Sequence, residues 1–168
     1  ADALGLRRMI AHFQALDAAA PYSPQRIACI LDPLQVIAHA ERLGIVEQVP
    51  HPFGNLVRVV DAQVKQLPYF RNNVLHLFAV PALIACLLGN NRRLDVQRLS
   101  DAVVGIYGIL RSALFLRWSE DELLREIQRT IGIFAGRGLL RRAEADGWLL
   151  APEANSLEFP ELQMIGET

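Results

Sequence analysis

Four polar side chains occur in a segment that otherwise has the composition of a buried helix. The segment is residues 68–78, PYFRNNVLHLF, and the four are Arg71, Asn72, Asn73 and His76. A polar side chain in such a place must either find hydrogen-bond partners or serve in binding or catalysis, because burying it unsatisfied is unfavourable. The cluster is therefore the first candidate site.

His12 and Asp17 are a second candidate, because their His-x4-Asp spacing is that of the catalytic dyad in glycerolipid acyltransferases. In such a dyad the imidazole is the base for the attacking hydroxyl, and the carboxylate orients the imidazole. On a continuous helix, however, residues five apart differ in direction by about 140°, so the two side chains point apart. We interpret His12 as an ordinary residue of an amphipathic helix and predict no catalytic residue.

Other catalytic and ligand-binding motifs are missing from the sequence. It contains no glycine-rich phosphate loop, no Cys-x2-Cys, no HExxH and no GxSxG, so it predicts neither a metal site nor a cofactor. Cys29 and Cys86 lie far apart in apolar surroundings with helical character. We expect both to be buried free thiols in a reducing compartment.

The composition points to an interface or to lipid contact. Of the 168 residues, 52% are apolar, which is above the usual ~45–50%. The mean hydropathy is +0.21, and such a surplus of apolar residues suggests a surface that is covered by a partner or by lipid. The net charge of -1 provides no general attraction to nucleic acid. The longest apolar run, residues 74–89, would reach only ~24 Å of a ~30 Å hydrocarbon core. We expect buried helices, or helices at a membrane surface, in place of a span.

Hydrophobic periodicity and capping signals predict a mainly α fold. Pro33 should open or bend the second helix, and Gly44 should end it. Pro81 should kink or break its helix, while Asp95 and the Ser119–Glu122 capping box should begin two others. The expected helices are 4–20, 25–43, a stretch from about 61 that restarts at Pro68, 95–116 and 119–136.

Two hairpins complete the expected fold. The first spans residues 45–60 with Pro52 and Gly54 in its turn, and the second spans residues 138–153 with Asp146-Gly147 in its turn. Each follows a helix and a glycine, in HAERLGIVEQ and in FAGRGLLRR. The predicted fold class is a helical domain with two short β-hairpin wings, that is, two winged-helix-like units.

Three segments carry a family resemblance: PYFRNNVLHLFAVPALIAC (68–86), ALFLRWSEDEL (113–123) and GLLRRAEADGWLLAP (138–152). In this order they resemble the C-terminal region of the bacterial membrane glycerol-3-phosphate acyltransferase of the PlsB type, and the similarity runs over essentially the whole chain. YFRNNVLHLFAVP and LFLRW are its most specific parts. The first residues, which lack both Met and the order of a signal peptide, also suggest a piece cut from a longer parent.

The resemblance implies a function at the cytoplasmic face of the bacterial inner membrane. The family transfers an acyl group from acyl-CoA or acyl-acyl-carrier protein to sn-glycerol 3-phosphate, which gives lysophosphatidic acid for phospholipid synthesis. Its catalytic motif, HRSHMD, is not present here. The resemblance therefore implies that residues 1–168 are a C-terminal helical region whose catalytic domain lies upstream. A subdivision of this region into residues 1–60 and 61–168 is one alternative. We expect the chain alone to be inactive.

Two interpretations of the polar cluster stay open. In the structural one, Asn72 and His76 satisfy backbone groups at a helix junction and Arg71 pairs with an acid such as Asp61. In the functional one, Arg71 and Asn73 face the upstream catalytic domain, either docking it or positioning the substrate phosphate. An arginine suits phosphate because its planar fork donates two hydrogen bonds.

Two other functional classes also remain. A winged-helix DNA-binding module would explain the wings, although it needs a basic recognition helix and IYGILRSALFL is too apolar for a DNA groove. A helical protein-interaction module would explain the apolar surplus.

Overall fold

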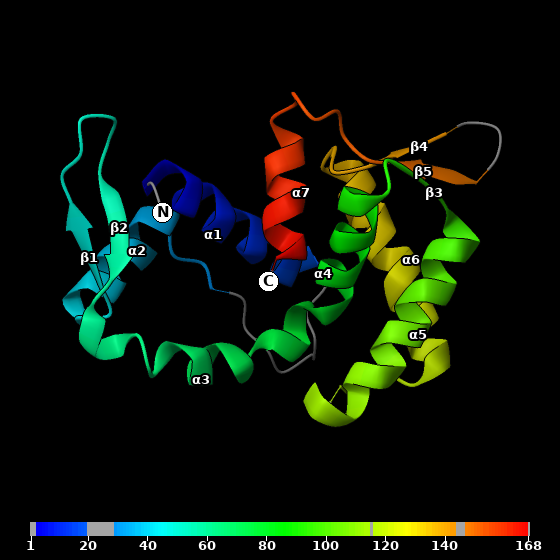
Figure 1. Cartoon of the computed structure of the whole chain (residues 1–168), viewed down its shortest axis with the longest axis horizontal. Helices are drawn as coiled ribbons and strands as arrows, with labels where there is room; N and C mark the ends of the chain where they lie inside the picture. Colours follow the sequence, from blue (N-terminus) through cyan, green and yellow to red (C-terminus); the bar gives the residue numbers. More distant parts are fainter. Residues whose placement is uncertain (1–2, 20–28, 115, 144–146, 168) are drawn as a thin grey trace. The chain divides into compact units, whose positions relative to one another are not determined.

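Helices dominate the computed structural model, as the sequence predicts (Figure 1). It describes residues 3–19, 29–114, 116–143 and 147–167. In these ranges the chain forms seven α-helices, one short 3-10 helix and two small antiparallel sheets. The chain divides into two compact units, Ala1–Arg71 (unit 1) and Asn72–Thr168 (unit 2).

Unit 1 is built from helices followed by one hairpin. Its elements in order are α1 (Ala3–Ala19), α2 (Pro33–Arg42), β1 (Val46–Val49), β2 (Leu56–Val59), the 3-10 helix η1 (Asp61–Gln63) and α3 (Leu67–Asn72), whose last residue belongs to unit 2.

A capping box fixes the start of α2 at Pro33. The Asp32 carboxylate accepts from the backbone N–H of Leu34 at 2.9 Å, and the Gln35 side-chain oxygen accepts from the Asp32 N–H at 3.1 Å. Pro33 occupies the first turn, where its missing N–H is not needed. The prediction that Pro33 opens the helix is confirmed. The predicted start at residue 25 is wrong for residues 29–32, which are not helical, and residues 25–28 lie outside the described ranges.

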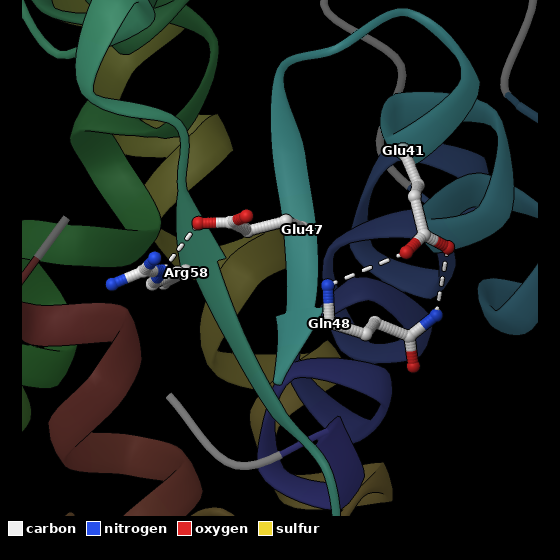
Figure 2. Close-up of polar contacts among 4 residues, drawn as sticks. All are labelled: Glu41, Glu47, Gln48 and Arg58. Carbon is white, nitrogen blue, oxygen red and sulfur yellow. Dashed lines mark hydrogen bonds and ion pairs between the residues drawn. The ribbon is translucent and has the colours of Figure 1, made fainter. Parts of the chain in front are cut away.

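The first predicted hairpin is confirmed. Gly44 follows the α2 C-cap with a φ of +67°, and β1 then pairs with β2 from Val46 opposite Val59 to Val49 opposite Leu56. Figure 2 shows how side chains support it: Glu47 lies opposite Arg58 and forms an ion pair with it. The Glu41 carboxylate at the end of α2 accepts from the Gln48 backbone N–H at 3.3 Å and from its side-chain amide at 2.9 Å. The hairpin is thus tied to its preceding helix.

Unit 2 is a complete winged-helix-like unit with one added helix. Its elements are α4 (Leu75–Asn90), β3 (Arg93–Asp95), α5 (Val96–Leu114), α6 (Glu120–Gly136), β4 (Arg141–Arg142), β5 (Trp148–Leu150) and α7 (Glu158–Gly166). β5 lies between β3 and β4 and is antiparallel to both. The predicted strands of the second hairpin are confirmed. Asp146 of its predicted turn lies outside the described residues, and β3 was not predicted.

The caps of α5 and α6 are those that the sequence predicts. The Asp95 carboxylate accepts from the N–H groups of Gln97 at 2.9 Å and Arg98 at 3.1 Å. The Glu122 carboxylate accepts from the Ser119 N–H at 2.9 Å and from its hydroxyl at 2.8 Å. These bonds satisfy amide groups that a helix start leaves without intrahelical partners.

The predicted break of the helix at Pro81 is wrong. α4 runs without a break from Leu75 to Asn90 through Pro81. Buried Val80, Ile84 and Leu88 hold it against the core on both sides of the proline, which outweighs one missing hydrogen bond.

The cysteine prediction is wrong about burial. Both cysteines are free thiols, as predicted, but Cys29 and Cys86 are exposed. Cys86 follows the buried pair Ile84 and Ala85, and one further residue turns the side chain about 100° away from that buried face.

The core of unit 2 lies between α4, α5, α6 and α7, beneath the small sheet. α7 runs beside α4 in Figure 1, and Gly166 brings the two backbones so close that a Cβ there would lie 2.9 Å from the Cys86 backbone nitrogen. The side chains buried at this core include Ile84, Leu88, Leu99, Val103, Ile127, Ile131, Phe134, Leu149 and Leu162. No helix in the described ranges is long and apolar enough to cross a bilayer.

Candidate functional site

The predicted polar cluster lies where α3 ends and α4 begins. Arg71 and Asn72 are the last residues of α3, Asn73 is in the turn that follows, and His76 is in the first turn of α4. Arg71 and Asn73 are exposed, His76 is half-buried, and the Asn72 side chain lies outside the description. The two compact units meet in sequence between Arg71 and Asn72. The roles of the four residues therefore remain predictions.

The His-x4-Asp pair is not assembled into a dyad. His12 and Asp17 both lie on the uninterrupted helix α1, where a separation of five residues turns their side chains apart. His12 is 3% exposed and packs edge-on against the Phe13 ring at 6.0 Å between centroids, while Asp17 is half-exposed. The two side chains therefore differ both in direction and in exposure.

Unit 2 contains an apolar hollow that neither the polar cluster nor the His-x4-Asp pair indicated. It has a volume of about 180 Å³ and lies between α4 and the C-terminal half of α5. Its lining is Leu75, Phe78, Ala79, Ala82 and Leu83 from α4, with Leu110 and Leu114 from α5. The hollow thus brings together residues of the two most specific segments of the resemblance: Leu75, Phe78 and Ala79 of YFRNNVLHLFAVP, and Leu114 of LFLRW.

A signal for this hollow was present in the sequence. The five α4 residues follow the spacing i, i+3, i+4, i+7, i+8, which makes one helix face. Val80, Ile84 and Leu88 form a second apolar face, which is buried in the core. A helix with two apolar faces indicates a second partner besides its own core.

Arg117 and Trp118, between α5 and α6, make two contacts that position them. The buried Tyr107 hydroxyl accepts from the Trp118 backbone N–H at 3.1 Å. The Arg117 guanidinium lies 4.2 Å from the centre of the Trp118 indole, within the range of a cation–π contact. Within LFLRW, Arg117 and Trp118 thus have structural contacts, whereas Leu114 lines the hollow.

A second hollow, of about 270 Å³, lies beside the wing of unit 2 and is polar. It is lined by Gly138, Arg141, Pro152, Glu153, Ser156 and Glu158. Close by in the sheet, the Arg93 guanidinium lies 4.2 Å from the centre of the Trp148 ring. Arginine and aromatic side chains are therefore concentrated at this sheet.

Two buried or half-buried charges have displaced pKa values. Burial raises the pKa of Glu126, although Arg129 at 3.9 Å partly opposes the shift. Burial lowers the pKa of Arg137, and Glu161 partly opposes that shift. Both lie on α6 or at its end, away from the hollow of α4 and α5. No group of acids, histidines and cysteines that could hold a metal ion occurs among the described residues.

Comparison with known proteins identifies the family. The sequence profile of the glycerol-3-phosphate acyltransferase C-terminal region matches residues 2–168. The chain belongs to this family. A glycerol-3-phosphate acyltransferase of Xylella fastidiosa is 43% identical over 123 residues, which are 73% of this chain and 14% of that protein.

Other curated relatives extend the match along the chain. The glycerol-3-phosphate acyltransferase of Xanthomonas axonopodis pv. citri is 37% identical over 150 residues, 88% of this chain and 17% of its own length. That of Pseudomonas fluorescens is 29% identical over 167 residues, 99% of this chain and 20% of its own. No solved structure matches the chain. The chain thus spans a fifth or less of its glycerol-3-phosphate acyltransferase relatives.

Proposed function

We propose that the chain is the non-catalytic C-terminal region of a glycerol-3-phosphate 1-O-acyltransferase. The parent transfers an acyl group from acyl-CoA or acyl-acyl-carrier protein to sn-glycerol 3-phosphate and releases lysophosphatidic acid. The observation that carries the proposal is the family match over residues 2–168, in relatives of which this region is only 14–20%. The reaction itself belongs to the rest of the parent chain, and residues 1–168 contribute no catalytic residue.

The role of the region is to dock the upstream catalytic domain of the same chain. The apolar hollow of unit 2 supports this role, because about 180 Å³ suits one large apolar side chain rather than a whole ligand. A pocket filled by a single apolar anchor is a common centre of a protein interface. The matched region is only 14% of the Xylella fastidiosa relative, and the rest of such a chain supplies the partner for this hollow.

Arg71 and Asn73 serve the same contact on the functional interpretation. Both side chains are exposed at the end of α3 and in the following turn, so they are accessible to a partner or a substrate. The Arg71 guanidinium either pairs with an acid of the catalytic domain or donates to the phosphate of glycerol 3-phosphate.

The parent acts at the cytoplasmic face of the bacterial inner membrane. Exposed apolar side chains support membrane contact by this region, among them Ile109 at 78% and Leu157 at 70% exposure. Such side chains gain free energy when an interface or a bilayer removes them from water.

The test of docking is an acyltransferase assay of the parent with residues 1–168 deleted and, separately, with Ala82→Phe, which fills the hollow. We expect the deletion to abolish turnover and Ala82→Phe to reduce it about 10- to 100-fold, since a misplaced domain misplaces reacting groups. Ala113→Phe, on the exposed face of α5, is the matched control and should leave turnover unchanged. Full activity of the deleted parent would contradict the proposal, as would turnover by the 168-residue chain alone.

Arg71→Ala separates the interpretations of the polar cluster. On the functional interpretation, the 168-residue chain should melt nearly unchanged while the parent loses activity. A raised KM for glycerol 3-phosphate would indicate phosphate positioning, and a lower rate at all substrate concentrations would indicate docking. A loss of about 1–3 kcal/mol in the unfolding free energy of the chain would instead support the structural interpretation. Arg58→Ala, at another exposed arginine, is the control.

One observation favours a second candidate function. The α4–β3–α5–α6–β4–β5 order of unit 2 is winged-helix-like, and such units bind DNA in other proteins. The first turn of α6 carries Glu120, Asp121 and Glu122, which would repel phosphate at a DNA groove. An electrophoretic shift with duplex DNA tests this candidate, and we expect none.

A further inference from the structure

The sheet of unit 2 has one face on which arginines surround an aromatic ring. In β3, β5 and β4, which lie side by side in Figure 1, Arg93 is opposite Leu150 and Leu150 is opposite Arg141. Residues directly opposite in antiparallel strands share a face, and Trp148, two residues before Leu150, shares it too. We call these four residues, Arg93, Trp148, Leu150 and Arg141, the arginine–tryptophan face.

The opposite face of the sheet is turned toward the core. Leu149, which alternates with Trp148 and Leu150 along β5, is fully buried. The arginine–tryptophan face therefore points outward, with Arg93 and Arg141 exposed and with Trp148 and Leu150 half-buried. Its two guanidinium groups come from β3 and β4, which lie on either side of β5. The backbones of β3 and β4 are therefore roughly 10 Å apart.

The two arginines of this face have no acid partner among the described residues. Arg93 stacks on Trp148 instead, and Arg141 borders the polar hollow without an ion pair to Glu153 or Glu158. Arg58 in unit 1 differs, since it forms an ion pair with the facing Glu47. Asp95, at the edge of this face, is engaged in capping α5. Arg93 and Arg141 thus keep donors for an external anion.

We infer that the arginine–tryptophan face binds the phosphate groups of anionic phospholipids at a bilayer surface. Guanidinium groups donate in pairs to phosphate oxygens, and indole rings favour the boundary between headgroups and acyl chains. Leu157, exposed in the loop that borders the polar hollow of Arg141, adds an apolar side chain that can enter the headgroup layer. This inference rests on the proposed function, because it names the surface through which a lipid-synthesising enzyme meets its membrane.

A bilayer suits this face better than nucleic acid or a free phosphate compound. The chain carries a net charge of -1, and the acids Glu153 and Glu158 line the hollow beside Arg141, so the basic area is small. Two arginines on a three-stranded sheet neither follow a nucleic-acid backbone nor enclose a small ligand. A plane of anionic headgroups can meet both arginines at once.

The test measures partition of the 168-residue chain onto vesicles by co-sedimentation. One set of vesicles is phosphatidylcholine alone, and the other is an equal mixture of phosphatidylcholine and phosphatidylglycerol. We expect binding to the mixed vesicles, weaker binding as sodium chloride screens the charges, and a loss of about fivefold for each of Arg93→Gln and Arg141→Gln. Arg111→Gln, at an exposed arginine in the last turn of α5, is the control and should bind as the unchanged chain does.

Three outcomes would overturn the inference. The first is unchanged vesicle binding by the Arg93→Gln/Arg141→Gln double variant, and the second is equal binding to both sets of vesicles. The third is loss of binding with Ile109→Ser but not with the double variant, which would place the lipid contact on α5. Circular dichroism melts of each variant exclude unfolding as the cause.

Two further experiments complete the test. The first asks whether the face prefers a bilayer to a free phosphate compound or DNA, and the second separates failure of this inference from failure of the proposed function. Binding that free glycerol 3-phosphate abolishes, or a preference for duplex DNA over the mixed vesicles, would also overturn the inference. The parent with the double variant should keep its activity in detergent micelles, where no anionic bilayer is needed. Loss of vesicle binding with normal micellar activity supports the inference, whereas an active parent without residues 1–168 refutes only the proposed function.

Discussion

The two hairpins begin with the same local device but are stabilised differently. Each follows a helix whose C-cap precedes a glycine with positive φ, +67° at Gly44 and +73° at Gly138. The unit 1 hairpin then pairs four residues with four, and its β strands contain only one buried residue, Val57. The unit 2 hairpin pairs fewer residues between β4 and β5, but β5 also pairs with β3 and its Leu149 is fully buried.

The difference teaches that a helix–glycine–hairpin pattern specifies local conformation and not the source of stability. In unit 1 the hairpin depends on near contacts, namely the Glu47–Arg58 pair and the hydrogen bonds from Gln48 to Glu41. In unit 2 it depends on apolar burial and on a strand that comes more than 50 residues earlier in the sequence. Burial contributes more free energy than exposed polar contacts do.

The largest expected effect is that of Leu149→Ala. We expect it to lower the unfolding free energy of unit 2 by about 2–5 kcal/mol, because it leaves a cavity beneath the sheet. Both tryptophans, Trp118 and Trp148, lie in unit 2, so indole fluorescence during urea denaturation reports this transition. Leu56→Ala in β2, where the side chain is exposed, is the control and should have little effect. Equal losses would show that the two hairpins are not stabilised differently.

The next effect tests what the hairpins share. Gly44→Ala and Gly138→Ala should each destabilise the chain by about 1–2 kcal/mol, because a side chain at positive φ meets the neighbouring carbonyl. Neither site is crowded enough to add a large steric term, since the nearest atom to a Cβ at Gly138 is the Glu158 Cγ at 3.6 Å. Gly132→Ala, within α6 and with open space around it, should be neutral or stabilising. Thermal melts would contradict the shared device if only one of the two glycines mattered.

The same contrast explains how much of the fold was predictable. The Ser119–Glu122 box, the Asp95 cap and the first hairpin depend on residues close in sequence, and all were predicted. β3 was missed because three residues show no periodicity and their partner is β5, more than 50 residues later. Burial of Cys86 was mispredicted because an apolar neighbourhood in sequence does not say which helix face meets the core.

The candidate site follows the same rule. The polar residues Arg71, Asn73 and His76 could be singled out because their types are unusual in an apolar segment. The hollow required knowing that α4 packs beside α5, and the arginine–tryptophan face required the pairing of β3 with β5. Neither juxtaposition can be derived from spacing along one helix or strand.

A third prediction compares the caps of the helices that lead into the hairpins. The hydrogen bonds from Ser119 hold the pKa of Glu122 below its ordinary value of 4.5, whereas the corresponding residue of α2, Gln35, has no proton to gain. The stability that Glu122 contributes is therefore present above pH 4.5 and is lost as the pH falls through its lowered folded pKa. Glu122→Gln should remove this part of the acid sensitivity of unit 2. Tryptophan-detected unfolding at pH 7 and near pH 3 checks it, and an unchanged pH dependence would refute the assignment.

The smallest expected effect concerns the Glu47–Arg58 pair of the unit 1 hairpin (Figure 2). The two side chains are directly opposite on paired strands, which favours attraction, but they are 43% and 67% exposed, so water and salt screen it. A double-mutant cycle with Glu47→Gln and Arg58→Gln should therefore give a coupling of only about 0.2–1 kcal/mol, which falls further in high salt. Because both tryptophans are in unit 2, the cycle is best followed by hydrogen exchange at the β1 and β2 amides. A coupling above about 2 kcal/mol that salt does not weaken would mean that near polar contacts hold a hairpin as strongly as burial does, and the distinction drawn between the two hairpins would then fail.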